Sequence, residues 1–172
     1  MSQSKSALLV IDIQNDYFPD GKFPLWNAEA TLDNIEGAIK KANAKNIPVI
    51  LIQHIAKSNL APFFCEGSTG ANIHPRILAV AANAPIVVKE FADGFVNTTL
   101  ESTLTQLGIT DLLVCGMMTQ NCVTHTAISK SAEKYKVTIL ADCCTTVSEI
   151  LHHIGLYAVT TRLSLATAAE VL

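Results

Sequence analysis

The stretch "DLLVCGMMTQNCVTHTAISKSAEKYKVTILAD", Asp111 to Asp142, contains the pattern on which the prediction of the fold depends. A nearly continuous apolar run ends at Gly116, a helical pattern begins near Cys122, and a second apolar run starts at Lys136. Strands that are apolar on both faces are typical of parallel sheets covered by helices on both sides. The stretch therefore predicts a strand, a helix and a second, parallel strand.

The same alternation of short apolar runs and helical patterns extends along the whole chain. Six runs are interpreted as strands: "SALLVIDI" (6–13), "IPVILIQH" (47–54), "APIVVKE" (84–90), "DLLVCGM" (111–117), "KVTILAD" (136–142) and "RLSLATA" (162–168). We predict a three-layer α/β/α fold with a doubly wound, Rossmann-like parallel sheet of six strands in the order 3-2-1-4-5-6. No linker or repeat interrupts it, so residues 1–172 are expected to form a single domain.

Composition and charge exclude several classes of protein. Of the 172 residues, 49% are apolar and only 16% are charged, which suggests a sheet buried on both faces or a large subunit interface. The net charge is −3, the pI is near 5.9 and no basic run is present, so we expect no nucleic-acid partner. No apolar stretch approaches the roughly 20 residues of a membrane span, and no signal-peptide cleavage site follows the N-terminus. We therefore expect a cytoplasmic protein without a membrane partner.

The five cysteines predict neither a disulfide framework nor a structural zinc site. Their number is odd, no signal sequence is present and no CxxC pair occurs. Most of these thiols are expected to be small buried apolar groups. Cys115 lies inside a strand-like run and is interpreted as structural.

Three ionisable residues stand at or just beyond the carboxyl ends of predicted strands. Asp12 lies near the end of the first strand, Lys89 near the end of the third, and Cys122 follows the fourth at a helix N-terminus. Ligands of open α/β sheets bind outside these strand ends, so the three side chains are expected to converge. Each also has a structural interpretation: Asp12 as a cap, Lys89 as a solvated strand end and Cys122 as an inert buried thiol.

Together the three residues suit nucleophilic catalysis. A free thiol has a pKa of roughly 8.5, and both a helix N-terminus and the charge of Lys89 would favour the thiolate. Asp12 would accept the thiol proton, and Lys89 would keep the carboxylate charged until then. His125, three residues after Cys122, is the alternative base, although it lies one turn inside the predicted helix.

Three segments around these residues resemble the isochorismatase-like cysteine hydrolase superfamily, which includes nicotinamidases, N-carbamoylsarcosine amidase and ureidoacrylate amidohydrolases. The segments are "LLVIDIQNDYF" (8–18), "VVKEFADGFVNTTLESTL" (87–104) and "LLVCGMMTQNCVTHTAISKSAEKYKVTILADCC" (112–144). Each is moderately specific alone, but all three occur in order at normal spacing. The resemblance covers essentially the whole chain.

The resemblance implies a catalytic triad of Asp12, Lys89 and Cys122, with Cys122 as the nucleophile. It also implies a cis peptide bond between Met117 and Met118, and an oxyanion hole formed by the N–H groups of Met118 and Cys122. Family members commonly form dimers or tetramers. We therefore expect a homo-oligomer, which the low charge fraction also fits.

The sequence departs from the resemblance where nicotinamidases bind a metal. Their Asp-x-His motif corresponds here to Ile52-Gln53-His54, which lacks the aspartate, so we predict no metal and no other cofactor. His54 then either contacts the substrate or packs as a hydrogen-bonded histidine. His152 and His153 are adjacent on a predicted helix and point to different sides, which is poor geometry for a metal.

The substrate pocket is expected to be small and mostly apolar. Aromatic residues near the motifs are its predicted lining: Phe18, Trp26 and Phe91, with Phe63 or Phe64 from the long irregular segment Ser58–Pro75. Ordinary core packing is the alternative for Phe18 and Phe91. The long segment is interpreted as a binding loop or lid, or as an ordinary surface excursion.

These features predict a cysteine-dependent hydrolase whose substrate is a small amide, imide or ureido compound. The enzyme is expected to act through a thioester intermediate. The small-molecule substrate is expected to be neutral or weakly polar, because only Asp12 and Lys89 are placed to bear charge in the site. One alternative is isochorismatase-type ether hydrolysis, which needs Asp12 more than Cys122. Another is a non-catalytic small-molecule-binding or redox-sensing domain. The sequence does not identify the substrate.

Overall fold

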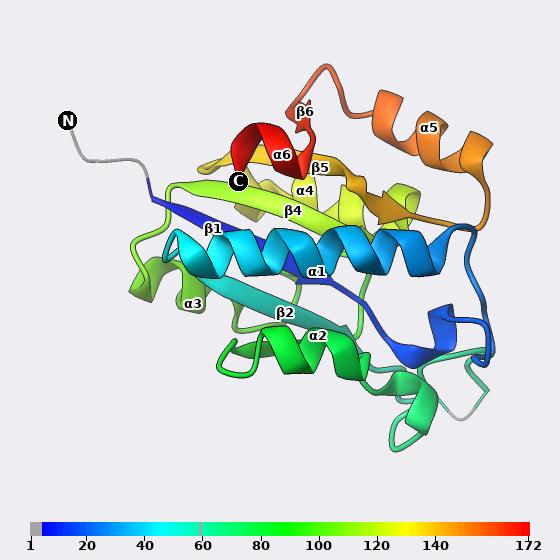
Figure 1. Cartoon of the computed structure of the whole chain (residues 1–172). Coiled ribbons are helices and arrows are strands. Elements are labelled where there is room, and N and C mark those ends of the chain that lie inside the picture. Colours follow the sequence, from blue (N-terminus) through cyan, green and yellow to red (C-terminus); the bar gives the residue numbers. More distant parts are fainter. Residues whose placement is uncertain (1–4, 59) are drawn as a thin grey trace.

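The computed structural model describes residues 5–58 and 60–172 (Figure 1). Its strands form a six-stranded parallel sheet in the order β3-β2-β1-β4-β5-β6, so the predicted fold and strand order are confirmed. The strands are β1 (Ser6–Ile11), β2 (Val49–His54), β3 (Ile86–Lys89), β4 (Asp111–Met117), β5 (Lys136–Thr145) and β6 (Ser164–Ala166). Residues 1–4 of the predicted domain and Asn59 of the predicted loop lie outside the described residues.

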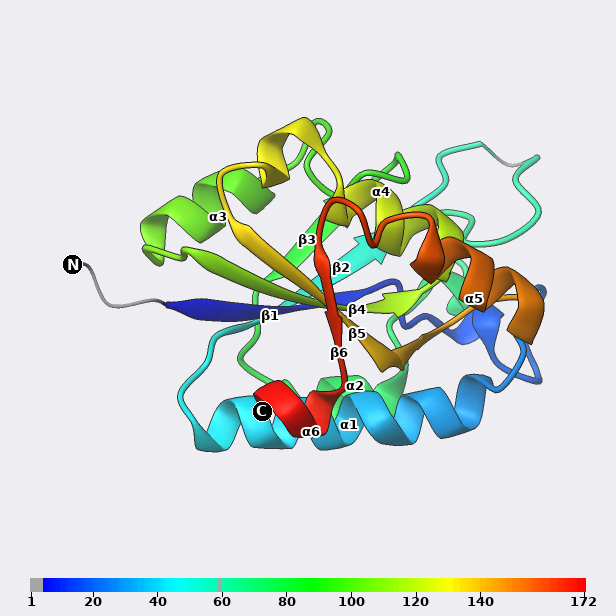
Figure 2. The ribbon, with the colours of Figure 1, turned by 90° about the horizontal axis from the view of Figure 1, so that it is seen from above.

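Helices cover both faces of the sheet (Figure 2). One face is covered by α1 (Ala28–Ala44), α2 (Pro75–Val80) and α6 (Ala168–Val171). The other is covered by α3 (Leu100–Gln106) and α4 (Thr124–Ala127), and α5 (Glu149–Tyr157) packs against the π-helical turn η3 (Thr119–Val123). Three 3-10 turns complete the described helices: η1 (Asn15–Tyr17), η2 (Thr69–Ala71) and η4 (Lys130–Ala132). Within the described ranges, no helix has both the length and the hydropathy of a bilayer span.

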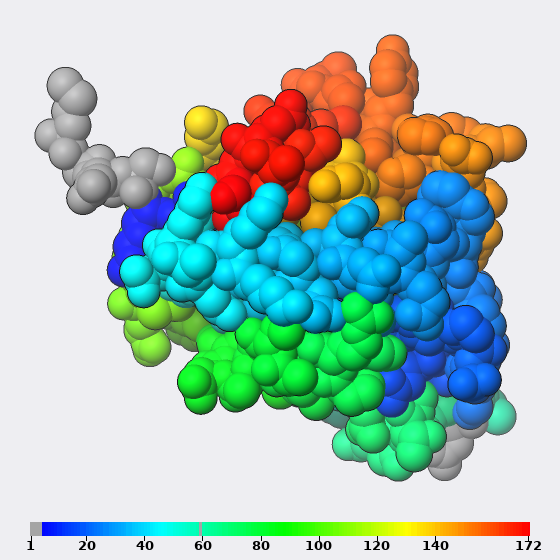
Figure 3. Space-filling model, in the orientation of Figure 1, coloured from blue at the N-terminus to red at the C-terminus, as the bar shows by residue number. Residues whose placement is uncertain are grey.

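The long helix α1 closes one face of the sheet because its apolar side chains recur at helical spacing. Leu32, Ile35, Ile39 and Ala42 form a stripe that is completely buried. The helix contacts β5, α2 and α6. In Figure 3, α2 and α6 lie on either side of α1, and their side chains meet those of α1 over this face.

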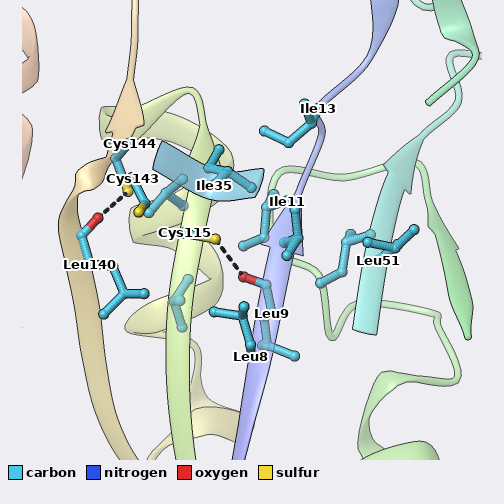
Figure 4. Packing of buried hydrophobic residues seen from close by; sticks show 14 of the residues in the cluster. Leu8, Leu9, Ile11, Ile13, Ile35, Leu51, Cys115, Leu140, Cys143 and Cys144 are labelled. Carbon is cyan, nitrogen blue, oxygen red and sulfur yellow. Dashed lines mark hydrogen bonds between the residues drawn. The ribbon is translucent and has the colours of Figure 1, made fainter. Parts of the chain in front are cut away.

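Three of the five cysteines belong to the core beside β4 and β5. Cys115, Cys143 and Cys144 are all buried. The Cys115 thiol donates to the Leu9 carbonyl and the Cys144 thiol to the Leu140 carbonyl, with sulfur–oxygen distances of 3.5 and 3.2 Å (Figure 4). Burial raises the pKa of each of the three thiols. The structural interpretation of Cys115 is confirmed.

Candidate active site

Asp12 is the first residue after β1, at a sharp turn of the backbone. Its φ of 53° lies in the left-handed region, which aspartate tolerates better than most residues with a side chain. Its N–H donates to the Ile52 carbonyl at 2.9 Å and so ties the turn to β2. The Asp12 side chain is completely buried. The sheet therefore holds a carboxylate inside the protein at the carboxyl end of a central strand.

Lys89 is the last residue of β3, and the alternation of this edge strand turns it inward. Lys89 is 1% exposed, whereas Ile86 and Val88 point to solvent. Its Nζ lies 2.8 Å from Asp12 Oδ2 and donates to Cys122 Sγ at 3.3 Å. The alternative of a solvated strand end is thus wrong, and the three residues predicted to converge are brought together.

Cys122 lies in η3, which follows β4. Near the end of β4, at a shift in its register with β5, Gly116 adopts a φ of 131°, and a Cβ on it would lie 2.1 Å from the Ile11 carbonyl oxygen, so this position requires glycine. The helical segment begins at Thr119, so Cys122 is its fourth residue, within the first turn. The predicted helix start is corrected, because a π-helical turn takes up extra residues before α4.

The Met118 backbone connects β4 to η3. The peptide bond between Met117 and Met118 is cis, and the Met118 carbonyl accepts from the Asn121 and Val123 N–H groups at 3.0 and 3.3 Å. Met118 and Cys122 are both buried. The assignment of their N–H groups to an oxyanion hole stays a prediction.

The electrostatics of the site favour a neutral thiol in the resting protein. Burial raises the pKa of Cys122, Asp12 raises it further, and Lys89 opposes these effects without reversing them. Burial lowers the pKa of Lys89, but Asp12 and Cys122 outweigh burial and keep the amine protonated. Lys89 lowers the pKa of Cys122, as expected, but the loss of hydration dominates, so the net shift is upward and not downward in this state.

The Asp12 carboxylate is free to take up a proton. Apart from the ion pair with Lys89, neither of its oxygens has a hydrogen-bond partner in the part of the chain that the structure describes. A carboxylate oxygen and the Cys122 sulfur lie within 4.8 Å of one another. A carboxylate beside a thiol is the arrangement that a general base requires.

His54, at the end of β2, joins the three predicted residues. Its Nδ1 lies 3.0 Å from Lys89 Nζ, and the two residues are partners in the register of β2 and β3. Gln14 fixes the backbone of His54, since its Nε2 donates to the His54 carbonyl and its Oε1 accepts from the His54 N–H, both at 2.8 Å. Gln14 was not predicted from the sequence, where its only signal is a polar residue two positions after Asp12.

The site residues do not fit a metal. Asp12, His54 and Cys122 offer ligand atoms within 4.8 Å of one another, but the Lys89 ammonium is bonded to all three groups. A cation held by these atoms would have to displace the ammonium or bear its repulsion. The residue in place of the nicotinamidase aspartate, Ile52, is buried and has no ligand atom. The absence of a bound metal stays a prediction.

The other histidines have partners elsewhere. His125 is exposed, and its Nδ1 lies 2.8 Å from the Asn121 carbonyl oxygen, which favours Asp12 over His125 as the base. His152 is buried with its Nδ1 2.8 Å from Thr119 Oγ1, whereas the adjacent His153 is exposed. The two rings nevertheless pack edge to face with their centres 5.2 Å apart, so the prediction that they point to different sides of α5 is wrong.

Two of the predicted aromatic residues lie beside His54. The buried Phe64 ring is centred 6.0 Å from the His54 ring, and Phe63 packs edge-on against Phe64 at 5.0 Å. Their segment is tied to the residues after β1, because the Phe64 N–H donates to Asp16 Oδ2 at 2.7 Å. Asp16 is itself buried, and the sequence did not single it out. The described part of the long segment is thus an anchored loop next to the site.

The remaining predicted pocket residues occupy three other environments. Phe18 is buried, with its ring centred 4.5 Å from that of His74. Trp26 is 37% exposed, with its ring 6.1 Å from that of His152. Phe91 is half exposed and lines a surface pocket of about 320 Å³. The structure does not gather these three residues into one apolar pocket.

Comparisons with known proteins agree with the fold. Residues 6–170 match the family model of the isochorismatase domain. The uncharacterized isochorismatase family protein YddQ of Bacillus subtilis is 36% identical over 143 residues, which make up 83% of this chain and 79% of that protein. Nicotinamidase 3 of Arabidopsis thaliana is 28% identical over 86% of this chain and 76% of its own length. The crystal structure of an isochorismatase-like hydrolase from Alkaliphilus metalliredigens superposes with a TM-score of 0.88 at 25% identity, covering 97% of this chain and 96% of that one.

Proposed function

Because the chain belongs to the isochorismatase family, whose members are hydrolases, we propose that it hydrolyses a C–N bond of a small amide, imide or ureido compound. The proposal rests on one observation: the buried Lys89 ammonium is bonded to both the Asp12 carboxylate and the Cys122 thiol. The relative Nicotinamidase 3 acts on an amide, which supports a C–N bond as the target.

In the first half of the reaction, Cys122 Sγ attacks the substrate carbonyl carbon while Asp12 takes the thiol proton. Because the pKa of the thiol is raised, the proton leaves as the S–C bond forms and not beforehand. The N–H groups of Met118 and Cys122 hold the oxyanion. Asp12 then passes the proton to the leaving nitrogen, the C–N bond breaks, and a thioester and a free amine remain.

In the second half, water hydrolyses the thioester. Asp12, again a carboxylate, removes a proton from the water as its oxygen attacks the thioester carbon. Collapse of this intermediate breaks the S–C bond, and the sulfur regains the proton from Asp12. The products are a carboxylic or carbamic acid and an amine, and the site returns to its starting state. Lys89 stays cationic throughout and offsets the negative charge that passes between Asp12 and Cys122.

The properties of Cys122 argue against a redox sensor. Sensor thiols are exposed and have a lowered pKa, so that oxidants meet a thiolate. Cys122 is 4% exposed and its pKa is raised. The sulfur is therefore enclosed, and a substrate that reaches it enters a site suited to transfer of the thiol proton.

A substrate panel tests the proposal. Purified wild type, Cys122→Ser and Cys65→Ser would be assayed on small amides, ureides and vinyl ethers. We expect hydrolysis of an amide or ureide that Cys122→Ser loses and Cys65→Ser keeps, because Cys65 donates only to the Ala61 carbonyl. Turnover confined to vinyl ethers and retained by Cys122→Ser would overturn the proposal in favour of ether hydrolysis.

A further inference from the structure

The Lys89 ammonium contacts three polar side chains in the structure, and His54 is one of them. Lys89 Nζ lies 2.8 Å from Asp12 Oδ2, 3.3 Å from Cys122 Sγ and 3.0 Å from His54 Nδ1. A lysine ammonium has three N–H donors and no acceptor. The contacts with Cys122 and His54 are hydrogen bonds, and the contact with Asp12 is an ion pair, so all three hold the ammonium inside the protein.

The contact with Lys89 fixes the state of the His54 ring. Since the ammonium can only donate, Nδ1 must be unprotonated, and the single proton of the neutral ring must then be on Nε2. Burial lowers the pKa of His54 and the Lys89 charge lowers it further, whereas Asp12 and Glu90 raise it. The net shift is downward, which agrees with a neutral ring at neutral pH.

The position of His54 is determined by several elements at once. Its backbone is hydrogen-bonded on both sides by Gln14, and Gln14 Nε2 also donates to the Ala71 carbonyl of η2 at 2.7 Å. Its ring faces that of Phe64 from the anchored loop. Gln14 thus fixes the backbone of His54, while Phe64 and Lys89 contact its imidazole.

We propose that His54 is a positioning residue for the proposed hydrolysis, whose Nδ1 accepts an N–H of Lys89 and so directs the ammonium toward Asp12 and Cys122. The inference rests on the proposed function. Without the acceptor on His54, the Lys89 amine can rotate or recruit a water, and its charge is no longer held between the base and the nucleophile.

Two variants of similar size separate this role from simple packing. His54→Asn keeps an acceptor oxygen near the place of Nδ1, whereas His54→Leu fills the space without an acceptor. Small misplacements of a catalytic group can cost up to about 100-fold in rate, so we expect His54→Leu to lower kcat roughly 10- to 100-fold. KM for a neutral amide should change little. His54→Asn should recover most of the lost kcat.

The pH profile gives a second measurement. Besides Lys89, the ionisable groups that face His54 are Glu90 after β3, Asp12 after β1 and Cys122 in η3. Below its pKa, the His54 ring carries a proton on Nδ1 and loses the Lys89 contact, so wild-type kcat should fall as the pH falls through that pKa. In His54→Asn this acid limb should move to lower pH. Wild-type kcat and an unchanged acid limb in His54→Leu would overturn the inference.

The tautomer of His54 can be measured without any substrate. Nitrogen-15 spectra of the labelled protein at neutral pH should show an unprotonated Nδ1 and a protonated Nε2 for the one histidine signal that His54→Asn removes. A protonated Nδ1 would overturn the inference. If the wild type hydrolyses nothing in the substrate panel, the proposed function fails. The spectra would still show whether His54 Nδ1 is unprotonated and can accept from Lys89.

Discussion

Two regions of the molecule hold buried cysteines, and they differ in the partners of the sulfur. Beside β4 and β5, Cys115 and Cys144 donate to backbone carbonyls and have no charged side chain as a hydrogen-bond partner among the described residues. At the strand ends, Cys122 accepts from the Lys89 ammonium, with the Asp12 carboxylate close by. Burial raises the thiol pKa in both regions.

The comparison teaches that burial and thiol pKa alone do not distinguish a nucleophile from a core residue. What distinguishes Cys122 from Cys115 and Cys144 is a neighbouring base that can take its proton and a cation, hydrogen-bonded to the sulfur, that can bear the resulting charge. The predictions below change one of these features at a time.

The largest effect is expected from exchanging the sulfur in each region. Cys122→Ala should reduce turnover by a factor on the order of 10⁴ or more and leave thermal unfolding close to that of wild type, because the nucleophile is lost and the fold is not. Cys144→Ala should show the reverse, with kcat retained and a loss of about 1–3 kcal/mol in the free energy of unfolding. Steady-state kinetics and urea denaturation would measure both. Equal kinetic losses in the two variants would remove the distinction between the regions.

A second large effect is expected from the buried ion pair. Lys89→Met leaves the Asp12 charge unpaired in the interior, which should cost about 3–5 kcal/mol of stability as well as turnover. Combining it with Asp12→Asn removes the stranded charge, so the double variant should regain much of the stability and none of the activity. Urea denaturation of the three proteins tests this. A double variant no more stable than Lys89→Met would contradict the pairing.

Asp12→Asn alone should separate thiol reactivity from turnover. The Asp12 charge raises the pKa of Cys122, so its removal should lower that pKa and increase the thiolate fraction, about tenfold for each unit of pKa. Iodoacetamide should then alkylate Cys122 faster than in wild type at pH 8, while hydrolysis is lost for want of a base. Peptide mass spectrometry would follow the alkylation. Slower alkylation in the variant would show that Asp12 does not act on the thiol as the structure indicates.

The smallest effect is expected at Cys65, which lies outside both of these regions. Its thiol is only partly buried and donates to the Ala61 carbonyl within the anchored loop. Cys65→Ser keeps a donor of similar size at this position, so kcat and KM should stay near wild-type values. A large kinetic change would mean that the loop contributes more to the site than its contacts with Asp16 and His54 suggest.

The sheet and the convergence of Asp12, Lys89 and Cys122 could be predicted from the sequence because both follow from local patterns. Nearly continuous apolar runs identify the parallel strands, and the ends of such strands lie at one edge of the sheet. The partners of His54 could not be predicted in this way. Its contact with Lys89 depends on the register of β2 and β3, and its support by Gln14 joins residues 40 positions apart.

The direction of the Cys122 pKa shift was also beyond the sequence. Its neighbours in the chain suggested a helix N-terminus and a lowered pKa, but the π-helical turn begins at Thr119, and the surrounding elements bury the sulfur. Desolvation depends on the whole tertiary environment, which no local motif encodes. The wrong grouping of Phe18, Trp26 and Phe91 into one pocket has the same cause. Closeness to a motif in the sequence does not determine on which side of the sheet a side chain lies.

The central claim is that Cys122 carries the acyl group of the substrate during turnover. Once the substrate panel identifies a substrate, rapid acid quenching within the first turnover, followed by peptide mass spectrometry, tests this directly. We expect the peptide containing Cys122 to gain the mass of the acyl group, in an amount that matches the initial burst of released amine. Release of the amine with Cys122 unmodified at every quench time would contradict the account.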